Sequence, residues 1–395
     1  MILSIVLIVT LGMLAGIFFD KLGLPGLLGM IIVGVIIGPY GLNMLAPTIL
    51  DNASEIRLMA LAIILLRAGL GLEKELLRRV GGTAIKMSAI PCLLEGFTIM
   101  AVAHVLLDLP VAEAGMLGFI VAAVSPAVIV PAMLKLIGQG RGMKRGVPVI
   151  VLAGASVDDV FAITLFTIFM GIAQQAEQSL LSHIIRLPLQ IGGGIVLGAL
   201  FGWGLAMLAR RLQPSHLEYV GITLVGAFSA LLIGEYLHIA GLLAVMTLGF
   251  VLQEKATKQA ERAAKTFGRV WFFAQIFLFV LIGAEVDLAV AWQAGLLGVV
   301  IITAGLLARA VGVWLSLAGS DLNNKERLFA IFAYLPKATV QAAIGGIPLA
   351  MGFASGSIIL AIAVLAVVIT ASLGAVAIKV MAPRLLERDA DDLSE

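Results

Sequence analysis

Two adjacent aspartates, Asp158 and Asp159, stand in the middle of an otherwise apolar stretch, LAGASVDDVFAITLF. A charged side chain at the centre of a membrane span costs about 2.5 to 3.5 kcal/mol, so it needs a partner or a water-filled cavity. Carboxylate oxygens suit a small alkali cation, and two neighbouring carboxylates in a poorly hydrated place hold protons more tightly than in water. The pair therefore predicts one site for which a cation and protons compete. The alternative is a buried ion pair with a basic residue that only fixes helix packing.

Lys337 lies in a second apolar stretch, AYLPKATVQAAIGG, directly after Pro336. Proline removes a helical hydrogen bond, and irregular backbone at membrane depth is tolerated only where protein or a hydrated cavity covers it. The SPAVIVP segment carries the same signal in the first half of the chain. We therefore expect two broken helices that face each other beside the aspartates, with Lys337 paired to Asp158 or Asp159. A purely structural lysine is the alternative. The expected broken-helix positions are Ser125, Pro126, Pro131, Pro336 and Thr339.

Glu95 in PCLLEGF and Arg309 in LLARAVG are also charged residues near the middle of apolar stretches, at an offset of 214 (309 − 95). A similar offset recurs elsewhere. LGLPGLL at 22–28 matches LHIAGLL at 237–243, an offset of 215 (237 − 22), and SPAVIV matches LPKATV at an offset of 210 (335 − 125). Inverted repeats of this kind are common in secondary transporters, where the substrate site lies at the midplane between the copies. We therefore expect Glu95 and Arg309 to form a structural salt bridge, with a role in gating or proton coupling as the alternative.

The composition requires a membrane protein. The 395 residues are 61% hydrophobic and 13% charged, with a mean hydropathy of +1.12, and Cys92 is the only cysteine, which excludes an intramolecular disulfide. A span needs roughly 20 apolar residues, so a chain of this length holds about thirteen spans and no separate soluble domain. The expected spans are 2–19, 25–39, 56–72, 82–107, 112–137, 147–173, 184–209, 217–236, 238–252, 268–284, 288–318, 327–351 and 357–381.

Basic residues gather on alternate connections between these spans, as in the GRGMKRG run at 140–146 and the stretch 255–269. The positive-inside rule then places the amino terminus outside and the carboxyl terminus, with its acidic tail, in the cytoplasm. No nucleophile with a base at plausible spacing and no metal-ligand cluster lies among the spans, so an enzyme is not expected.

Four segments, SPAVIVPAMLKL, LAGASVDDVFAIT, FVLIGAEVDL and YLPKATVQAAIG, together resemble the monovalent cation:proton antiporter superfamily, and most closely its NHA type, the subfamily B branch of the solute carrier 9 exchangers. The resemblance implies that Asp158 and Asp159 bind the cation and protons, that Lys337 is the lysine of the second broken helix, and that Glu95 and Arg309 are the intramembrane acid/arginine pair. The animal NHA proteins usually carry a longer amino-terminal extension, which this chain lacks, so the compact form looks bacterial and an inner-membrane location is expected.

The resemblance further implies an all-α integral membrane protein with two inverted-topology six-helix repeats, two broken crossing helices and a homodimer. It implies a dimerisation domain and a core domain that moves like an elevator. The implied boundaries are a scaffold at 1–80 and 212–287, a core at 81–175 and 288–383, a linking helix at 176–211 and a cytoplasmic tail at 384–395.

The expected function is sodium or lithium/proton antiport, with no cofactor beyond the transported ions and no nucleic-acid partner. Two acids with a lysine offer more proton sites than one cation needs, which favours electrogenic exchange. The alternatives are a potassium/proton antiporter, a sodium-coupled symporter of an organic anion, and an ion channel whose broken helices line a continuous pore.

Overall fold

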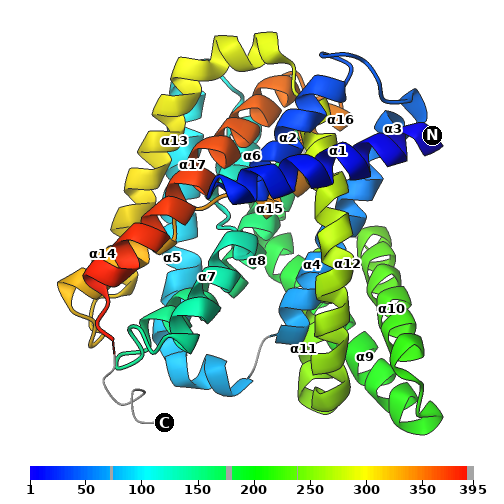
Figure 1. The fold of residues 1–395 in the computed structure, drawn as a ribbon, viewed down its shortest axis with the longest axis vertical. Coiled ribbons are helices and arrows are strands. Elements are labelled where there is room, and N and C mark those ends of the chain that lie inside the picture. Colours follow the sequence, from blue (N-terminus) through cyan, green and yellow to red (C-terminus); the bar gives the residue numbers. More distant parts are fainter. Residues whose placement is uncertain (72–73, 175–179, 238, 389–395) are drawn as a thin grey trace. The chain divides into compact units, whose positions relative to one another are not determined.

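The computed structural model describes residues 1–71, 74–174, 180–237 and 239–388, and its regular elements are helices throughout these ranges (Figure 1). The helices of the first part are α1 (Ile2–Lys21), α2 (Gly26–Ile37), α3 (Pro47–Asp51), α4 (Ala53–Gly71), α5 (Lys74–Leu107), α6 (Val111–Ala122), α7 (Pro126–Gly138) and α8 (Val147–Gln174). Those of the second part are α9 (Leu180–Leu212), α10 (His216–Tyr236), α11 (Gly241–Lys255), α12 (Thr257–Ala284), α13 (Leu288–Ser316), α14 (Asn324–Ala333), α15 (Thr339–Ile344), α16 (Ile347–Ala350) and α17 (Gly356–Leu385).

The chain is a multi-pass membrane protein. Within the described residues, seven helices are long and apolar enough to cross a bilayer, and further apolar helices are shorter. Every span expected from the sequence overlaps a helix, and two of those spans are interrupted. The seven long apolar segments are Ile2–Lys21, Ile85–Leu107, Gly192–Leu212, His216–Tyr236, Thr257–Ala284, Gly295–Ser316 and Gly356–Leu385.

Residue contacts divide the chain into two compact units. The first comprises Met1–Ser54, Arg79–Ala173 and Phe279–Glu395, and the second comprises Glu55–Arg78 and Gln174–Leu278. In the second unit α11 packs against α9 and α10 around a core that includes Tyr219 and Phe267. The first unit holds all the charged residues that the sequence singles out. The expected scaffold and core domains are defined by which part of the protein moves, whereas these units are defined by contacts. The domain division therefore stays a prediction.

Two spans of the first unit are interrupted at membrane depth. The first span ends as α6 at Ala122 and resumes as α7 at Pro126; the second ends as α14 at Ala333 and resumes as α15 at Thr339. Both expected breaks are therefore present. Pro131 was wrongly expected to be a break position, because α7 continues through it. A proline inside a helix removes only one backbone hydrogen bond, which the rest of the helix can tolerate where its surroundings support it.

A capping box defines where α14 begins. The Asn323 side chain accepts a hydrogen bond from the Glu326 backbone N–H at 2.9 Å, and Glu326 Oε2 accepts one from the Asn323 N–H at 2.8 Å. Arg145, in the loop between α7 and α8, donates to the same carboxylate oxygen at 2.9 Å. The start of α14 is thereby attached to the segment that leads into the aspartate-bearing helix.

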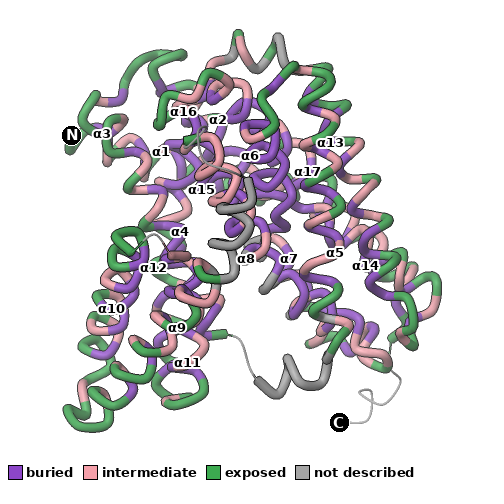
Figure 2. Tube along the Cα trace, turned by 180° about the vertical axis from the view of Figure 1, so that it is seen from behind, coloured by how far each residue is buried: buried purple, intermediate pink, exposed green. Residues whose placement is uncertain are grey.

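The long helix α17 organises the first unit. It contacts both halves of the first broken helix, α6 and α7, and it also packs against α13, α14, α15 and α16 (Figure 1). Its residues facing these neighbours are buried, as Figure 2 shows along the same helices. Pro336, in the second break, packs directly on Gly374 of α17. A side chain at position 374 would overlap the proline ring.

The end of α17 is joined to the loop between α7 and α8, a contact that we call the carboxyl-terminal clasp. Arg141 and Arg388 form an isolated antiparallel bridge, and the Gly142 N–H donates to the Glu387 carbonyl at 2.9 Å. Leu386 is buried in the core around Leu136 and also packs against Gly142.

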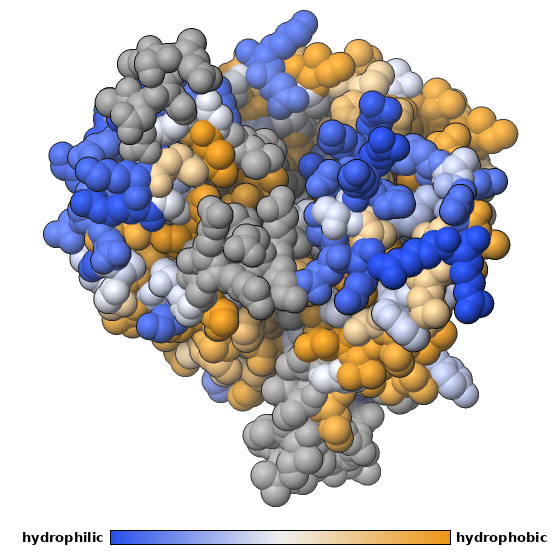
Figure 3. Space-filling model, turned by 90° about the horizontal axis from the view of Figure 1, so that it is seen from below, coloured by the Kyte–Doolittle hydropathy of each residue, from blue (hydrophilic) through white to orange (hydrophobic). Residues whose placement is uncertain are grey.

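Figure 3 views the molecule from below, towards the end where α7 finishes and α14 begins, and hydrophilic side chains gather on that face beside hydrophobic ones.

The close approach of Pro336 to Gly374 predicts the effect of a single added methyl group. In Gly374→Ala the new Cβ would lie 2.7 Å from Pro336 Cδ, and the rigid proline ring has little freedom to move. We expect the free energy of unfolding to fall by about 1 to 3 kcal/mol, as for other overpacked sites. Thermal melting of the purified protein in detergent measures this. Gly221→Ala in α10 is the matched control, since its Cβ would meet no atom within 4 Å, and equal melting temperatures for the two variants would contradict the prediction.

Candidate functional site

Five ionisable side chains gather at the crossing of the two broken helices, and none is more than 4% exposed. We call them the charge cluster. Three are acids and two are bases, so the cluster carries one uncompensated negative charge when all are ionised (3 − 2). Its members are Glu95 on α5, Asp158 and Asp159 on α8, Arg309 on α13 and Lys337 in the break before α15.

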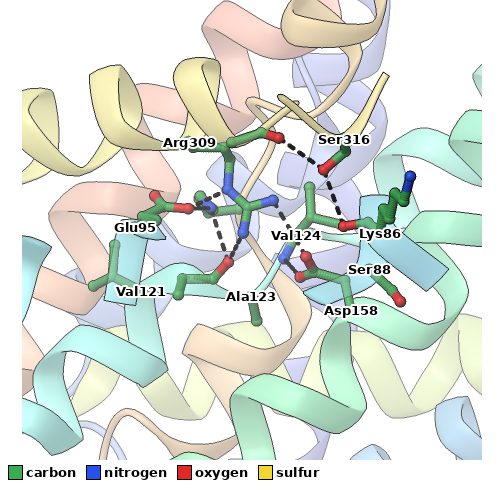
Figure 4. A network of polar contacts seen from close by, with 12 residues as sticks. Lys86, Ser88, Glu95, Val121, Ala123, Val124, Asp158, Arg309 and Ser316 are labelled. Atoms are coloured by element: carbon green, nitrogen blue, oxygen red, sulfur yellow. Dashed lines mark hydrogen bonds and ion pairs between the residues drawn. The ribbon is translucent and has the colours of Figure 1, made fainter. Parts of the chain in front are cut away.

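Arg309 is the centre of the cluster, and Figure 4 shows its guanidinium reaching three acceptors. Its Nε donates to Glu95 Oε2, its Nη1 lies 3.3 Å from Asp158 Oδ1, and its Nη2 donates to the Ala122 carbonyl. The ion pair expected between Glu95 and Arg309 is therefore present. A guanidinium suits this place because its donors are fixed in a planar fork and can serve several acceptors together.

Lys337 does not pair with an aspartate, so the expected contact was wrong. Its Nζ lies 2.6 Å from Glu95 Oε2 and 3.2 Å from the Ala122 carbonyl oxygen. The physical reason is that Asp158 is already served by other donors, whereas the carboxyl end of α6 presents carbonyls that need them. Glu95 thus holds both bases on a single oxygen, and its Oε1 has no hydrogen-bond donor among the described residues.

The two aspartates have different surroundings although they are adjacent. Asp158 Oδ2 accepts the Val124 backbone N–H at 2.8 Å and Oδ1 faces Arg309, so both of its oxygens are occupied. Asp159 Oδ1 is buried and has no donor in the part of the chain that the structure describes, although Asp158, Arg309 and Lys337 lie within electrostatic range. Neighbouring residues on a helix point about 100° apart, which accounts for the difference.

The two breaks are hydrogen-bonded to each other. The Ser125 N–H donates to the Pro336 carbonyl at 2.8 Å, and Ser125 Oγ lies 3.5 Å from Thr339 Oγ1. The Lys337 N–H donates to Thr370 Oγ1 on α17 at 3.0 Å. These backbone groups of the two breaks are therefore satisfied within the protein, as required at membrane depth.

Two further buried residues touch this network and were not expected from the sequence. Gln341 on α15 donates to carbonyls at the end of α6, and the Tyr334 ring lies 5.7 Å from the Arg309 guanidinium. Gln341 follows Lys337 by four residues, a spacing that places residues on one side of a regular helix, but an uncharged amide in an apolar span gives a weak signal. Tyr334 gave no signal at all, because tyrosine is common at membrane interfaces.

The Tyr334 hydroxyl fits into a space that a glycine leaves open. A Cβ on Gly154 would overlap this hydroxyl, and Gly154 lies one helical turn before Asp158 on α8. The hydroxyl itself has no hydrogen-bond partner among the described residues. Tyr334 therefore supports the Arg309 guanidinium through its ring, by a cation–π contact, and the glycine allows that position.

Two interrupted helices that meet around buried charges in an all-helical membrane protein form the architecture of secondary transporters. The family described as "Sodium/hydrogen exchanger, transmembrane" matches residues 5–382, and the chain belongs to that family. It is thus a member of a transporter family and not of an enzyme family.

Two human relatives are similar over nearly the whole chain. Sodium/hydrogen exchanger 9B2 is 34% identical over 387 residues, which cover 92% of this chain and 70% of the human protein. Human sodium/hydrogen exchanger 9B1 is 32% identical over 386 residues, which cover 93% of this chain and 74% of that protein. The resemblance to the subfamily B branch is thereby confirmed.

A solved structure shares the fold. The sodium proton antiporter MjNhaP1 from Methanocaldococcus jannaschii, at pH 8, superposes with a TM-score of 0.81 and 22% sequence identity, covering 96% of this chain and 97% of that one. The predicted fold class is therefore confirmed.

The shared position of two bases on Glu95 predicts a strong effect of removing its charge. In Glu95→Gln, Arg309 and Lys337 would remain buried without their common carboxylate, a change that costs about 3 to 5 kcal/mol for other buried ion pairs. We expect a marked fall in melting temperature in detergent. Glu261→Gln on the exposed side of α12 is the control, with an expected change within about 0.5 kcal/mol. A Glu95→Gln protein that melts with the wild type would show that the cluster does not need this pair.

The contact of Tyr334 with Gly154 predicts a suppressor. Gly154→Ala would push the tyrosine out of its space and destabilise the protein by about 1 to 3 kcal/mol. Tyr334→Phe should be nearly neutral, because the hydroxyl that it removes has no partner. In the double variant the closest overlapping atom is gone and only the contact with Met87 Cβ remains, so stability should return part of the way towards that of Tyr334→Phe. Melting curves of the three variants measure this, and a double variant no better than Gly154→Ala would contradict it.

Proposed function

We propose that this protein exchanges Na⁺ or Li⁺ for H⁺ across the membrane by alternating access, with Asp159 as the exchanging carboxylate and Asp158 beside it. The family supports the reaction, since the human relatives are named sodium/hydrogen exchangers and the structural neighbour is described as a sodium proton antiporter. The cluster supports the choice of residues.

The observation that carries the proposal is the charge imbalance at the crossing. Three acids face two bases, and Asp159 is the acid that no base contacts within the described residues. One monovalent cation neutralises the remaining charge, whether it is a proton or an alkali ion. Because burial makes an uncompensated charge costly, the site favours being loaded with one or the other. Mutual exclusion at one carboxylate is what couples the two flows.

The cation requires more oxygen ligands than one carboxylate supplies. Hydroxyl and carbonyl oxygens of the breaks, with water, are the ligand types that suit Na⁺ or Li⁺. The second proton site that electrogenic exchange needs is Lys337, whose ammonium is shared between Glu95 and a carbonyl.

The movement that exposes the site to alternate faces is proposed from the family resemblance. Residues 81–175 and 288–383 form the moving core, and 1–80 with 212–287 form the scaffold of a homodimer, linked by 176–211. The membrane is a bacterial inner membrane, with the amino terminus outside and the tail at 384–395 in the cytoplasm. The basic connections between spans support this orientation.

The rival functions differ in what crosses the membrane. In a potassium/proton antiporter the same cluster would bind the larger K⁺ ion. Measuring exchange with Na⁺, Li⁺ and K⁺ separates this function from sodium or lithium/proton exchange. A symporter of an organic anion would move no protons outward when Na⁺ is added. A channel would pass single-channel currents far above the turnover of a carrier, which an electrical recording from a bilayer would detect.

Asp159→Asn tests the function directly. An amide keeps the shape of the side chain but neither releases a proton nor carries the negative charge that binds a cation. In proteoliposomes that report proton efflux by dequenching of a pH-sensitive dye, we expect cation-driven efflux to fall to the level of empty liposomes. Asp321→Asn, at an exposed position, should keep wild-type exchange.

The Asp159→Asn protein should remain folded, because Asp159 Oδ1 has no hydrogen-bond donor to lose among the described residues. Its melting temperature in detergent provides that check. Full exchange activity in this variant would overturn the assignment of Asp159, and proton efflux driven by K⁺ alone in the wild type would favour the potassium antiporter.

A further inference from the structure

Gln341 makes contacts at the carboxyl end of α6 that the exchange chemistry does not require. Its side chain is 1% exposed, and its Nε2 lies 2.9 Å from the Ile120 carbonyl oxygen, 3.2 Å from that of Val121 and 2.8 Å from that of Ala123. The last carbonyls of a helix have no partner within the helix, so a donor at this place satisfies an obligatory need.

The chemistry of the site determines which way the amide points. The three acceptors are carbonyl oxygens, which an amide nitrogen can serve and an amide oxygen would repel. The Oε1 atom is then directed away, and it has no donor among the described residues. Leaving the Oε1 acceptor buried and unpaired is unfavourable. The contribution of Gln341 to this site is therefore the hydrogen bonds that its nitrogen donates to the carbonyls.

The other two donors at the end of α6 differ from Gln341 in charge. Lys337 and Arg309 both reach the Ala122 carbonyl, and both are also bonded to acids of the charge cluster, Glu95 and Asp158. Their balance between carbonyl and carboxylate therefore depends on whether a proton or a cation is bound. Gln341 carries no charge, and its side-chain hydrogen bonds to the described residues go to backbone carbonyls.

The segment that Gln341 holds leads directly to an aspartate. Ala123, its nearest acceptor, precedes Val124, whose N–H donates to Asp158 Oδ2 at 2.8 Å. A displacement of Ala123 would move that N–H through the intervening peptide, which is planar and stiff. The geometry of Asp158 therefore depends on the clamp at Ala123.

We propose that Gln341 is a positioning residue for cation exchange: its neutral amide holds the carboxyl end of α6 in one place whatever the load, and so keeps the Val124 N–H on Asp158 while Asp159 exchanges its ion. The proposal rests on the exchange function proposed above. Without the clamp, Lys337 and Arg309 would be drawn to the freed carbonyls and away from the acids, and the site would bind its cation less tightly.

The test compares three variants of the full chain in proteoliposomes. Gln341→Leu removes the donor, Gln341→Glu replaces it with a group of the same shape, and Gln253→Leu makes the same change at a buried glutamine of the second unit. The KM for Na⁺ and the maximal rate are measured across a range of pH. We expect Gln341→Leu to raise KM by roughly three- to tenfold with a smaller change in maximal rate, and Gln253→Leu to keep the wild-type KM.

Gln341→Glu adds a readout that a packing role would not give. A protonated glutamic acid has one O–H to donate to the carbonyls, whereas the ionised form would repel the carbonyl end of the helix. The charged groups around this end are Lys337 and Arg309, with Glu95 and Asp158 beyond them. Since these are unchanged in the variant, the ratio of variant to wild-type KM isolates the new carboxyl, and we expect that ratio to rise with pH.

The outcomes separate the two proposals. Liposomes with wild-type protein that show no cation-driven proton movement would overturn the exchange function itself. An active wild type, with unchanged KM in Gln341→Leu and a pH-independent ratio in Gln341→Glu, would overturn the positioning role. If Gln341→Leu fails to fold, as judged by size-exclusion chromatography in detergent, Gln341→Glu at acid pH decides the question, because it retains a donor.

Discussion

A helix that stops inside a membrane must find hydrogen-bond donors for its last carbonyls, and everything at the centre of this protein depends on how that need is met. The donors at the end of α6 are Arg309, Lys337 and Gln341, all from the second half of the sequence. Two of these also neutralise buried acids. The break is stable because the bases are there, and the bases are tolerated at this depth because the break and the acids surround them.

This arrangement distinguishes the carboxylates that form ion pairs with a base from the one that does not. Glu95 takes both bases on one oxygen, and Asp158 is held by a backbone N–H and a guanidinium, whereas Asp159 forms no ion pair with a base among the described residues. A network that satisfied every acid would be a rigid packing element. Since the described bases pair with Glu95 and Asp158, the unbalanced negative charge of the ionised cluster falls on Asp159.

Much of this could be predicted from the sequence, because charge in an apolar span is costly and therefore informative. Glu95 and Arg309 were paired from their offset alone, and the prolines located both breaks. The partner of Lys337 could not be predicted, since a sequence shows how many charges are present but not which oxygen each one reaches. Gln341 could not be predicted because an uncharged amide costs less to bury than a charged group and so gives a weaker signal. Pro131 does not mark a break because a helix can continue past one missing hydrogen bond.

The carboxyl-terminal clasp couples the end of the last helix to the loop before the aspartate-bearing helix. Backbone contacts join residues 387–388 to the loop at 141–142, between the first broken helix and the helix of the aspartates. The bridge between Arg141 and Arg388 and the hydrogen bond from Gly142 to Glu387 therefore attach the end of α17 to the bend that precedes α8. A shift at the end of α17 would therefore also move the segment that starts α8, so these two distant parts of the sequence behave as one mechanical unit.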